Sequence, residues 1–166
     1  ETLFKSSANA VIGYANNAYK TAGLSANQYM STATSFSASL LQSLGQDTEA
    51  AARYADMAIT DMSDNANKIG TSMEMIQNAY QGFAKQNYTM LDNLKLGYGG
   101  TKEEMQRLLS DAEKLSGLEF DISSYADVVD AIHIVQTEMG ITGTTALEAS
   151  TTIQGSLASV KAAWTN

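Results

Sequence analysis

Residues 47–70 read DTEAAARYADMAITDMSDNANKIG, and this stretch decides the fold class. Asp47 is a residue type that caps the start of a helix, and Gly70 is the type that most often ends one. Between them, the apolar residues recur mostly at steps of three and four, which is the spacing of one helix face: Ala51, Tyr54, Ala55, Ala58, Met62, Ala66 and Ile69. The pattern predicts a helix about 34 Å long, with its charged residues on the opposite side.

The same succession of cap, apolar stripe and glycine extends in both directions along the chain. Further helices are expected over residues 3–22, 25–45, 71–87, 101–117 and 124–139, and from residue 145 onward. Four of them open with a capping box, a Ser or Thr followed three residues later by Glu or Gln: Ser25 with Gln28, Thr71 with Glu74, Thr101 with Glu104, and Thr145 with Glu148. We therefore predict an all-α, multi-helix bundle of about six to seven helices joined by Gly turns. The last helix is a candidate for continuation into a longer coiled coil.

Composition agrees with helices and excludes several kinds of site. The 166-residue chain is 44% hydrophobic and has no proline, the residue that breaks helix interiors. The lack of cysteine excludes disulfides, thiolate metal sites and cysteine nucleophiles. A net charge of −8 disfavours binding to nucleic acid or to an anionic membrane surface. We expect no direct nucleic-acid binding, no transmembrane segment and no cofactor.

Three local patterns invite a chemical interpretation. Residues 97–102 (GYGGTK) resemble a phosphate loop, but Thr precedes Lys, and two glutamates fill the first helical turn where a phosphate would lie. His133 is the only histidine; Asp130 three residues earlier is a candidate orienting partner, and a metal site usually needs a second imidazole or a thiolate. Asp56, Asp61 and Asp64 lie close together on one predicted helix, and we interpret them as a solvated face.

Among enzymatic activities, hydrolysis of the bacterial cell wall is the strongest alternative to a non-catalytic role. Cysteine peptidases need a cysteine and zinc endopeptidases need more than one histidine, so only a lysozyme-like glycosidase with a buried glutamate is left. Among the glutamates inside the predicted helices, Glu113 and Glu138 are those that capping and first-turn charge do not explain. Because no motif supports them, we predict that the chain is not an enzyme and assign no catalytic, cofactor-binding or metal-binding residue.

The last predicted helix carries a heptad-like seam that still runs where the sequence ends. Ile153, Leu157, Val160 and Trp164 follow one another at steps of four, three and four. Either Trp164 folds back onto the bundle, or the helix continues and the seam is an association surface. We expect the second, and interpret the chain, which starts at Glu1 without Met, as a piece of a longer protein.

Several long motifs resemble tail tape measure proteins of long-tailed phages and prophages of Gram-positive bacteria. The similarity covers about residues 24–164 and rests on residues 36–45 (FSASLLQSLG), 55–68 (ADMAITDMSDNANK), 76–105 (IQNAYQGFAKQNYTMLDNLKLGYGGTKEEM), 151–157 (TTIQGSL) and 161–164 (KAAW). Residues 1–23, rich in Ser, Asn and Ala, depart from it. We expect a helical arm over residues 1–23 and a helical tape-measure-family domain over 24–166.

The resemblance implies a structural role. Such proteins set tail length, organise tail tube assembly and leave the tube ahead of the DNA at infection. They act in the host cytoplasm during assembly and then in the tail lumen of the virion. The implied partners are a few copies of the protein itself, the tail tube protein, tail assembly chaperones and tail tip proteins. The part of such a protein that sets tail length, which we call the ruler, should be one long uninterrupted helix. Glycines divide this piece into short helices, so we expect a compact bundle beside the ruler. The alternatives are a wall-degrading helical domain of a tape measure protein and a generic helical protein-interaction module.

Overall fold

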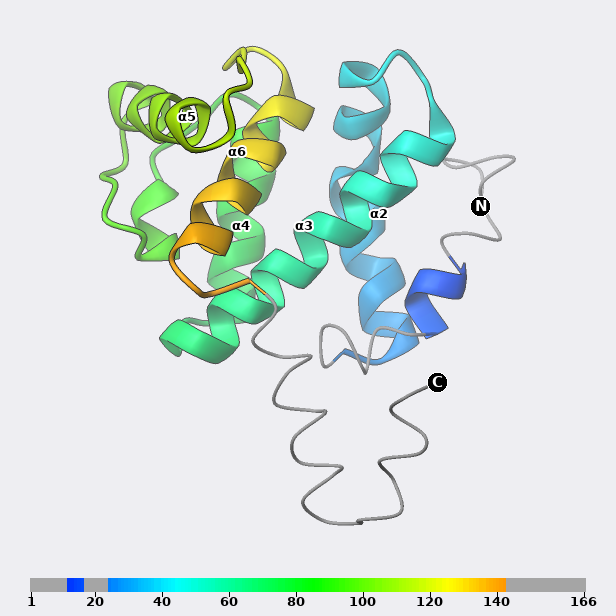
Figure 1. Cartoon of the computed structure of the whole chain (residues 1–166). Coiled ribbons are helices and arrows are strands. Elements are labelled where there is room, and N and C mark those ends of the chain that lie inside the picture. The colour runs from blue at the N-terminus through cyan, green and yellow to red at the C-terminus, as the bar shows by residue number, and fades with distance from the viewer. Residues whose placement is uncertain (1–11, 17–23, 143–166) are drawn as a thin grey trace, which may run out of the picture.

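A computed structural model describes residues 12–16 and 24–142, and the described chain is helical (Figure 1). Residues 12–16 form a short helical stretch. The elements that follow are α2 (Ala26–Ser43), α3 (Thr48–Ile69), α4 (Met73–Ala84), the 3-10 helix η2 (Leu91–Leu94), α5 (Lys102–Ser116) and α6 (Tyr125–Glu138). No strand occurs in the described ranges, and the predicted all-α bundle is confirmed. The helix expected from residue 145 onward, with its seam, lies outside them, as does most of residues 1–23.

Local capping chemistry sets most helix boundaries as the sequence predicts. Ser25 makes the full capping box with Gln28, and Asp47 accepts from the Ala50 amide. Gly70 ends α3 in the left-handed conformation with φ of 86°. One predicted cap is wrong by a residue: Ser72, not Thr71, caps α4, because the Thr71 hydroxyl donates instead to Asn65 Oδ1 at 2.7 Å.

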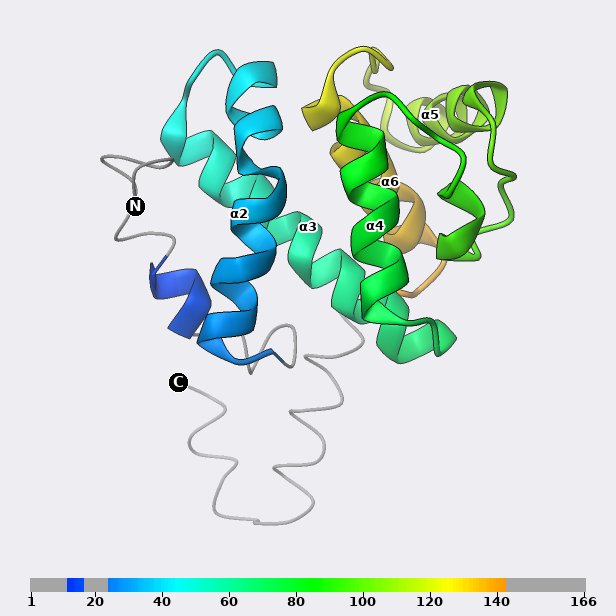
Figure 2. The same cartoon turned by 180° about the vertical axis from the view of Figure 1, so that it is seen from behind.

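Helix α3 is the central element, and it packs against α2, α4 and α6. Figures 1 and 2 show α3 crossing the molecule obliquely, with α2 along one part of it and α4 and α6 along the other. Helix α5 lies across the outer side and packs mainly against α6. The small side chains of α3 allow this close approach, since Ala51 and Ala58 are fully buried.

One continuous hydrophobic core joins these helices. Its largest fully buried side chains come from every described element from α2 to α6: Tyr29, Leu40, Ile59, Met62, Ile76, Tyr80, Phe83, Leu91, Leu94, Met105, Leu108 and Ile132. Burial of one such side chain contributes about 1.5–3 kcal/mol. Phe36 meets Tyr125 edge to face at 6.3 Å between ring centroids, which ties α2 to the start of α6.

The 97–100 segment is a loop, as predicted, and it is held against α5. The Gly99 amide donates to Glu104 Oε1 at 2.9 Å, and Arg107 donates to the Gly97 carbonyl at 2.8 Å. The Arg107 guanidinium also lies 4.3 Å from the centroid of the Tyr98 ring. The Arg107 and Gly99 hydrogen bonds lower the pKa of Glu104 to about 2. The loop amide that a phosphate would require is therefore bonded to a carboxylate of the protein.

Candidate functional site

The main polar cluster of the described residues lies inside the bundle, where α3 meets α6. Asp61, Asp64 and Asn65 of α3 and Gln136 of α6 are each at most 1% exposed. The solvated-face interpretation is therefore wrong for Asp61 and Asp64; Asp56 is half-buried. The reason is that α3 has neighbours on several sides, so the residues beside its apolar stripe are covered as well.

Asn65 is the hub of this cluster. Its Nδ2 donates to the Leu94 carbonyl at 2.8 Å and to Gln136 Oε1 at 3.0 Å, and its Oδ1 accepts from the Thr71 hydroxyl. One amide thus connects α3 to η2, to α6 and to the turn before α4. Only an amide supplies both donors and an acceptor in this geometry, so the position is specific for Asn.

Asp61 anchors the end of α6 and the residues after it. Its carboxylate lies 3.0 Å from His133 Nδ1 and accepts from the Thr142 hydroxyl at 2.9 Å. The Asp61 carbonyl accepts from Gln136 Nε2 at 3.1 Å. Burial raises the pKa of Asp61, whereas the hydrogen bond from His133 acts in the opposite direction. The interior of the bundle therefore contains an Asp–His pair whose acidic member is almost completely covered.

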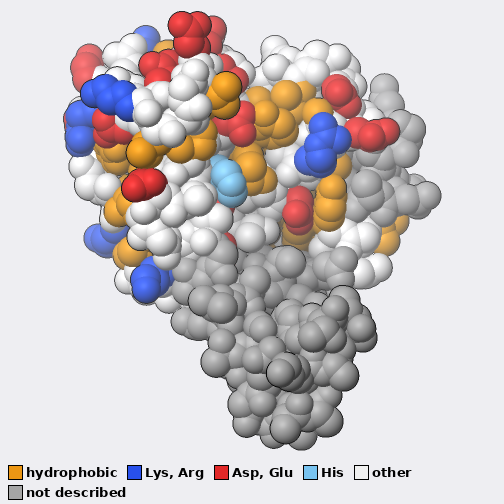
Figure 3. Space-filling view, viewed as in Figure 1, with side chains coloured by type: hydrophobic (Ala, Val, Ile, Leu, Met, Phe, Trp, Pro, Cys, Tyr) orange, Lys and Arg blue, Asp and Glu red, His pale blue; other side chains and the backbone are white. Residues whose placement is uncertain are grey.

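His133 pairs with Asp61 and not with Asp130, the partner suggested by sequence spacing. The Asp130 carboxylate accepts from the Tyr54 hydroxyl at 2.7 Å, and Tyr29 makes the same kind of bond to Asp56 at 2.6 Å. Figure 3 shows the histidine, in pale blue, at the surface beside hydrophobic side chains. Its ring is partly exposed on one side and bonded to a buried carboxylate on the other.

An Asp–His pair orients the imidazole in many hydrolases, where the far ring nitrogen takes a proton from a nucleophile. The hydroxyl that bonds to this pair, from Thr142, donates to the Asp61 carboxylate and thus lies on the anchoring side of the pair. This geometry fits a structural role, in which Asp61 attaches α6 and residues 139–142 to α3. Among the described residues, no group of three or more His, Cys, Asp or Glu side chains is placed to hold a metal ion.

The two glutamates considered for wall hydrolysis lie in different places. Glu113 Oε2 accepts from the Phe120 amide at 2.9 Å and so closes the turn after α5. Glu138 is exposed beside a hollow lined by Tyr98, Leu115 and Met139. The two glutamates line separate hollows. Among the described residues, neither is hydrogen-bonded to a member of the Asp61 cluster.

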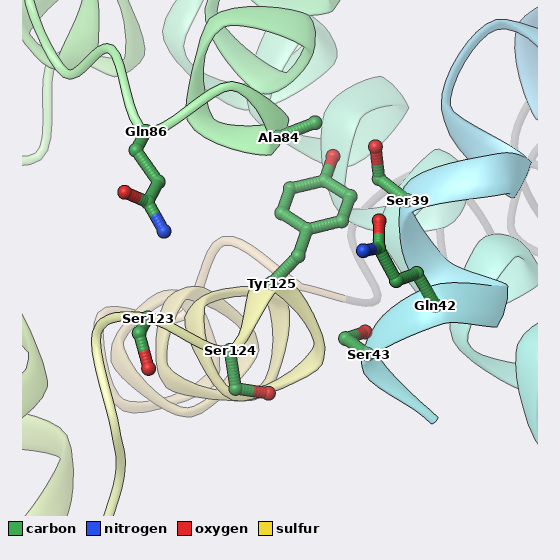
Figure 4. Close-up of a pocket in the computed structure, with 8 residues that line it drawn as sticks. All are labelled: Ser39, Gln42, Ser43, Ala84, Gln86, Ser123, Ser124 and Tyr125. Atoms are coloured by element: carbon green, nitrogen blue, oxygen red, sulfur yellow. The ribbon is translucent and has the colours of Figure 1, made fainter. Parts of the chain in front are cut away.

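A second candidate is a polar cavity of about 330 Å³ where the ends of α2 and α4 meet the start of α6 (Figure 4). Four serines, two glutamines, one tyrosine and one alanine line it. Sequence analysis did not find this cavity, because its lining comes from three segments far apart in the chain. A signal for the Asp61 cluster was present: Asp61 follows Ala58 by three residues and Asn65 follows Met62 by three, so both adjoin the apolar stripe.

Comparison of the chain with models of protein families, with curated proteins and with solved structures finds no match. No helix of the described residues is long and apolar enough to cross a membrane. The description of the fold and of the two polar sites therefore rests on the structure of this chain alone.

The Asp61–His133 pair predicts a pH-dependent stability. The hydrogen bond to Asp61 raises the pKa of His133, and the charges of Asp61, Asp130 and Asp64 add to this, against partial burial. A histidine whose pKa is higher in the folded state stabilises the fold fully below its unfolded value of about 6.5 and loses that contribution as the pH rises through the folded value. We expect about 1 kcal/mol or less between pH 6 and 8, because solvent screens the partly exposed imidazole.

Urea unfolding at several pH values checks this prediction, together with an NMR titration of the single imidazole. His133→Gln should remove most of the dependence between pH 6 and 8. Since the sequence has one histidine, no other imidazole contributes. An imidazole pKa at or below 6.5, with the same pH dependence in wild type and variant, would contradict the pairing.

Proposed function

We propose that this chain is a structural segment of a tail tape measure protein of a long-tailed phage or prophage. In this role it contributes to the protein that sets tail length, organises tube assembly and leaves the tube ahead of the DNA. It acts through contacts with tail tube, chaperone and tip proteins and performs no catalysis. Its places of action are the host cytoplasm during assembly and the tail lumen afterwards.

The observation that supports the proposal is where the family-like motifs fall in the fold. The stretch 55–68 supplies Asp61 and Asn65, and the stretch 76–105 supplies η2, whose Leu94 carbonyl accepts from Asn65. These are interior contacts between helices. The residues that carry the resemblance thus include contacts in the interior of the bundle, as expected for a structural segment.

The segment is proposed to work as a compact bundle beside the ruler. Its longest described helix, α3, has 22 residues, and the chain reverses direction after it. Association with a few further copies is proposed to use the seam of Ile153, Leu157, Val160 and Trp164, which lies outside the described residues. Closed rotational symmetry would suit such a seam.

Tail morphology tests the proposal in a phage or prophage that encodes this chain. We expect in-frame deletion of residues 24–142 to reduce the number of complete tails or change their length in electron micrographs. A fully extended helix over these residues would span about 180 Å, so a compact bundle predicts a clearly smaller change in length. A gene copy supplied in trans should restore normal tails.

Normal numbers of tails with wild-type length in the deletion strain would overturn the proposal. Shortening by about 180 Å would instead place the segment in the extended ruler and overturn its compact form. Clearing of purified peptidoglycan by the isolated chain, lost on Glu113→Gln or Glu138→Gln, would favour the wall-degrading alternative.

A further inference from the structure

A hollow with an apolar wall lies where the last turns of α5 and α6 meet. It has a volume of about 330 Å³, and Leu115, Val135 and Met139 form its apolar wall. Leu115 and Met139 are 49% and 47% exposed, so two long apolar side chains meet solvent at this one place. An apolar group that covered them would remove their surface from water, which is favourable.

The polar rim of the hollow carries a net negative charge. Of the described residues that line it, Asp111 and Glu138 are acidic and Lys114 is basic. Lys114 lies in the last turn of α5, where it compensates the partial negative charge of that helix end. Asp111 already accepts from the Tyr98 hydroxyl. Helix α6 has no basic residue in its last turn, so its carbonyl end and Glu138 together favour a cation.

The sequence after α6 combines an apolar group with a positive charge. Residues 143–166, a stretch of 24 residues outside the described ranges, begin four positions beyond Met139. Lys161 is the only Lys or Arg after Lys114, and Trp164, the only tryptophan of the chain, follows it by three positions. At helical spacing, two residues three positions apart share one face. The predicted last turn thus has the chemistry that the hollow favours.

The predicted helix carries this turn away from the hollow of its own chain. A helix from residue 145 to residue 164 spans about 30 Å, and it begins within a few residues of Met139. To return to the hollow, the chain would have to reverse within that helix. The apolar steps of four, three and four from Ile153 to Trp164 continue through it instead. A second copy can present Lys161 and Trp164 to the hollow without any reversal.

We propose that the hollow between the ends of α5 and α6 binds the turn of Lys161 and Trp164 from a second copy of this chain. The indole of that copy covers Leu115 and Met139, and its ammonium group lies beside Glu138. The contact gives the association seam a partner surface, and it rests on the proposed function only for its place in the tail. Each copy carries both parts, so a small number of copies can close a symmetric ring.

Fluorescence of Trp164 in the full 166-residue chain tests the contact, because no other tryptophan contributes. As the concentration rises from micromolar to millimolar, we expect the emission to move to shorter wavelength and quenching by acrylamide to fall. Both changes should follow the association measured by sedimentation. Leu115→Gln should raise the dissociation constant about fivefold, because it removes apolar surface that the indole would cover. Leu118→Gln is the matched control: Leu118 is 59% exposed but does not line the hollow.

A charge exchange tests the position of Lys161. Glu138→Lys and Lys161→Glu should each weaken association, and the two substitutions together should restore it. Leu115, Leu118 and Glu138 are all exposed, so their variants should unfold at the wild-type temperature when followed by circular dichroism. Failure of the double exchange to restore association would overturn the pairing of Lys161 with Glu138.

A chain that stays monomeric up to millimolar concentration overturns the proposal. So does association that Leu115→Gln leaves unchanged or that Leu118→Gln weakens equally. A short-wavelength emission that does not depend on concentration would place Trp164 against its own chain and would also overturn it. These measurements use purified protein, so their failure leaves the tail phenotype of the 24–142 deletion as it is, and normal tails in that deletion strain would not change them.

Discussion

Replacing Asn65 by aspartate should destabilise the fold by about 3–5 kcal/mol at pH 7, although the two side chains have nearly the same shape. The carboxylate cannot donate to the Leu94 carbonyl or to Gln136 Oε1, the two acceptors that Asn65 now bonds. It would also place a third acidic group in an interior that already holds Asp61 and Asp64. A loss of this size is a large share of the stability of a small domain.

Urea unfolding of the purified chain measures the effect, and Asn67→Asp is the control. Asn67 lies two residues further along the same helix and is exposed, so its variant should change stability by less than about 0.5 kcal/mol. Burial raises the pKa of a carboxyl group. The Asn65→Asp penalty should therefore shrink as the pH falls toward 4, where the group takes up a proton. Equal stability of the two variants at pH 7 would show that Asn65 is not the interior hub.

Gly100→Ala should destabilise the fold by about 2–3 kcal/mol, a drop in melting temperature of about 10 °C. A Cβ atom at Gly100 would lie 2.2 Å from the Thr89 carbonyl oxygen and 2.9 Å from its carbon. These are backbone atoms, so rotation of a side chain cannot relieve the clash. Gly100 has no positive φ; glycine is required there by space and not by conformation.

The neighbouring glycine provides the control for this substitution. A Cβ at Gly99 would meet only the Glu104 side chain, at 3.6 and 3.7 Å, which is ordinary contact. Gly99→Ala should therefore change the melting temperature by no more than a few degrees, as thermal unfolding followed by circular dichroism will measure. Similar melting temperatures for the two variants would mean that the 97–100 loop moves freely away from Thr89.

The sequence predicted the features that depend on local chemistry. Caps such as Asp47 and Ser25 and the left-handed ends at Gly70 and Gly117 act within one turn of their own helix, so spacing is enough to find them. The position of Asp61 beside the apolar stripe was visible in the sequence, but its burial was not predictable in this way. An aspartate beside an apolar stripe has the same local pattern whether solvent or a second helix covers it.

The candidate sites needed the three-dimensional structure for the same reason. His133 and Asp61 are 72 positions apart, and Asp130 at helical spacing was the only partner that the local pattern offered. The approach of Gly100 to Thr89 is likewise a tertiary feature. Each depends on how separate segments meet and not on residue type.

The hydrogen bond between Thr142 and Asp61 has a mechanical consequence. Tension applied to the chain beyond Thr142 reaches the bundle at a point where a hydroxyl is bonded to a buried carboxylate and Ile141 is 2% exposed. Part of the force therefore passes to α3, the helix that contacts α2, α4 and α6. We expect pulling on that side to load α3 together with the end of α6.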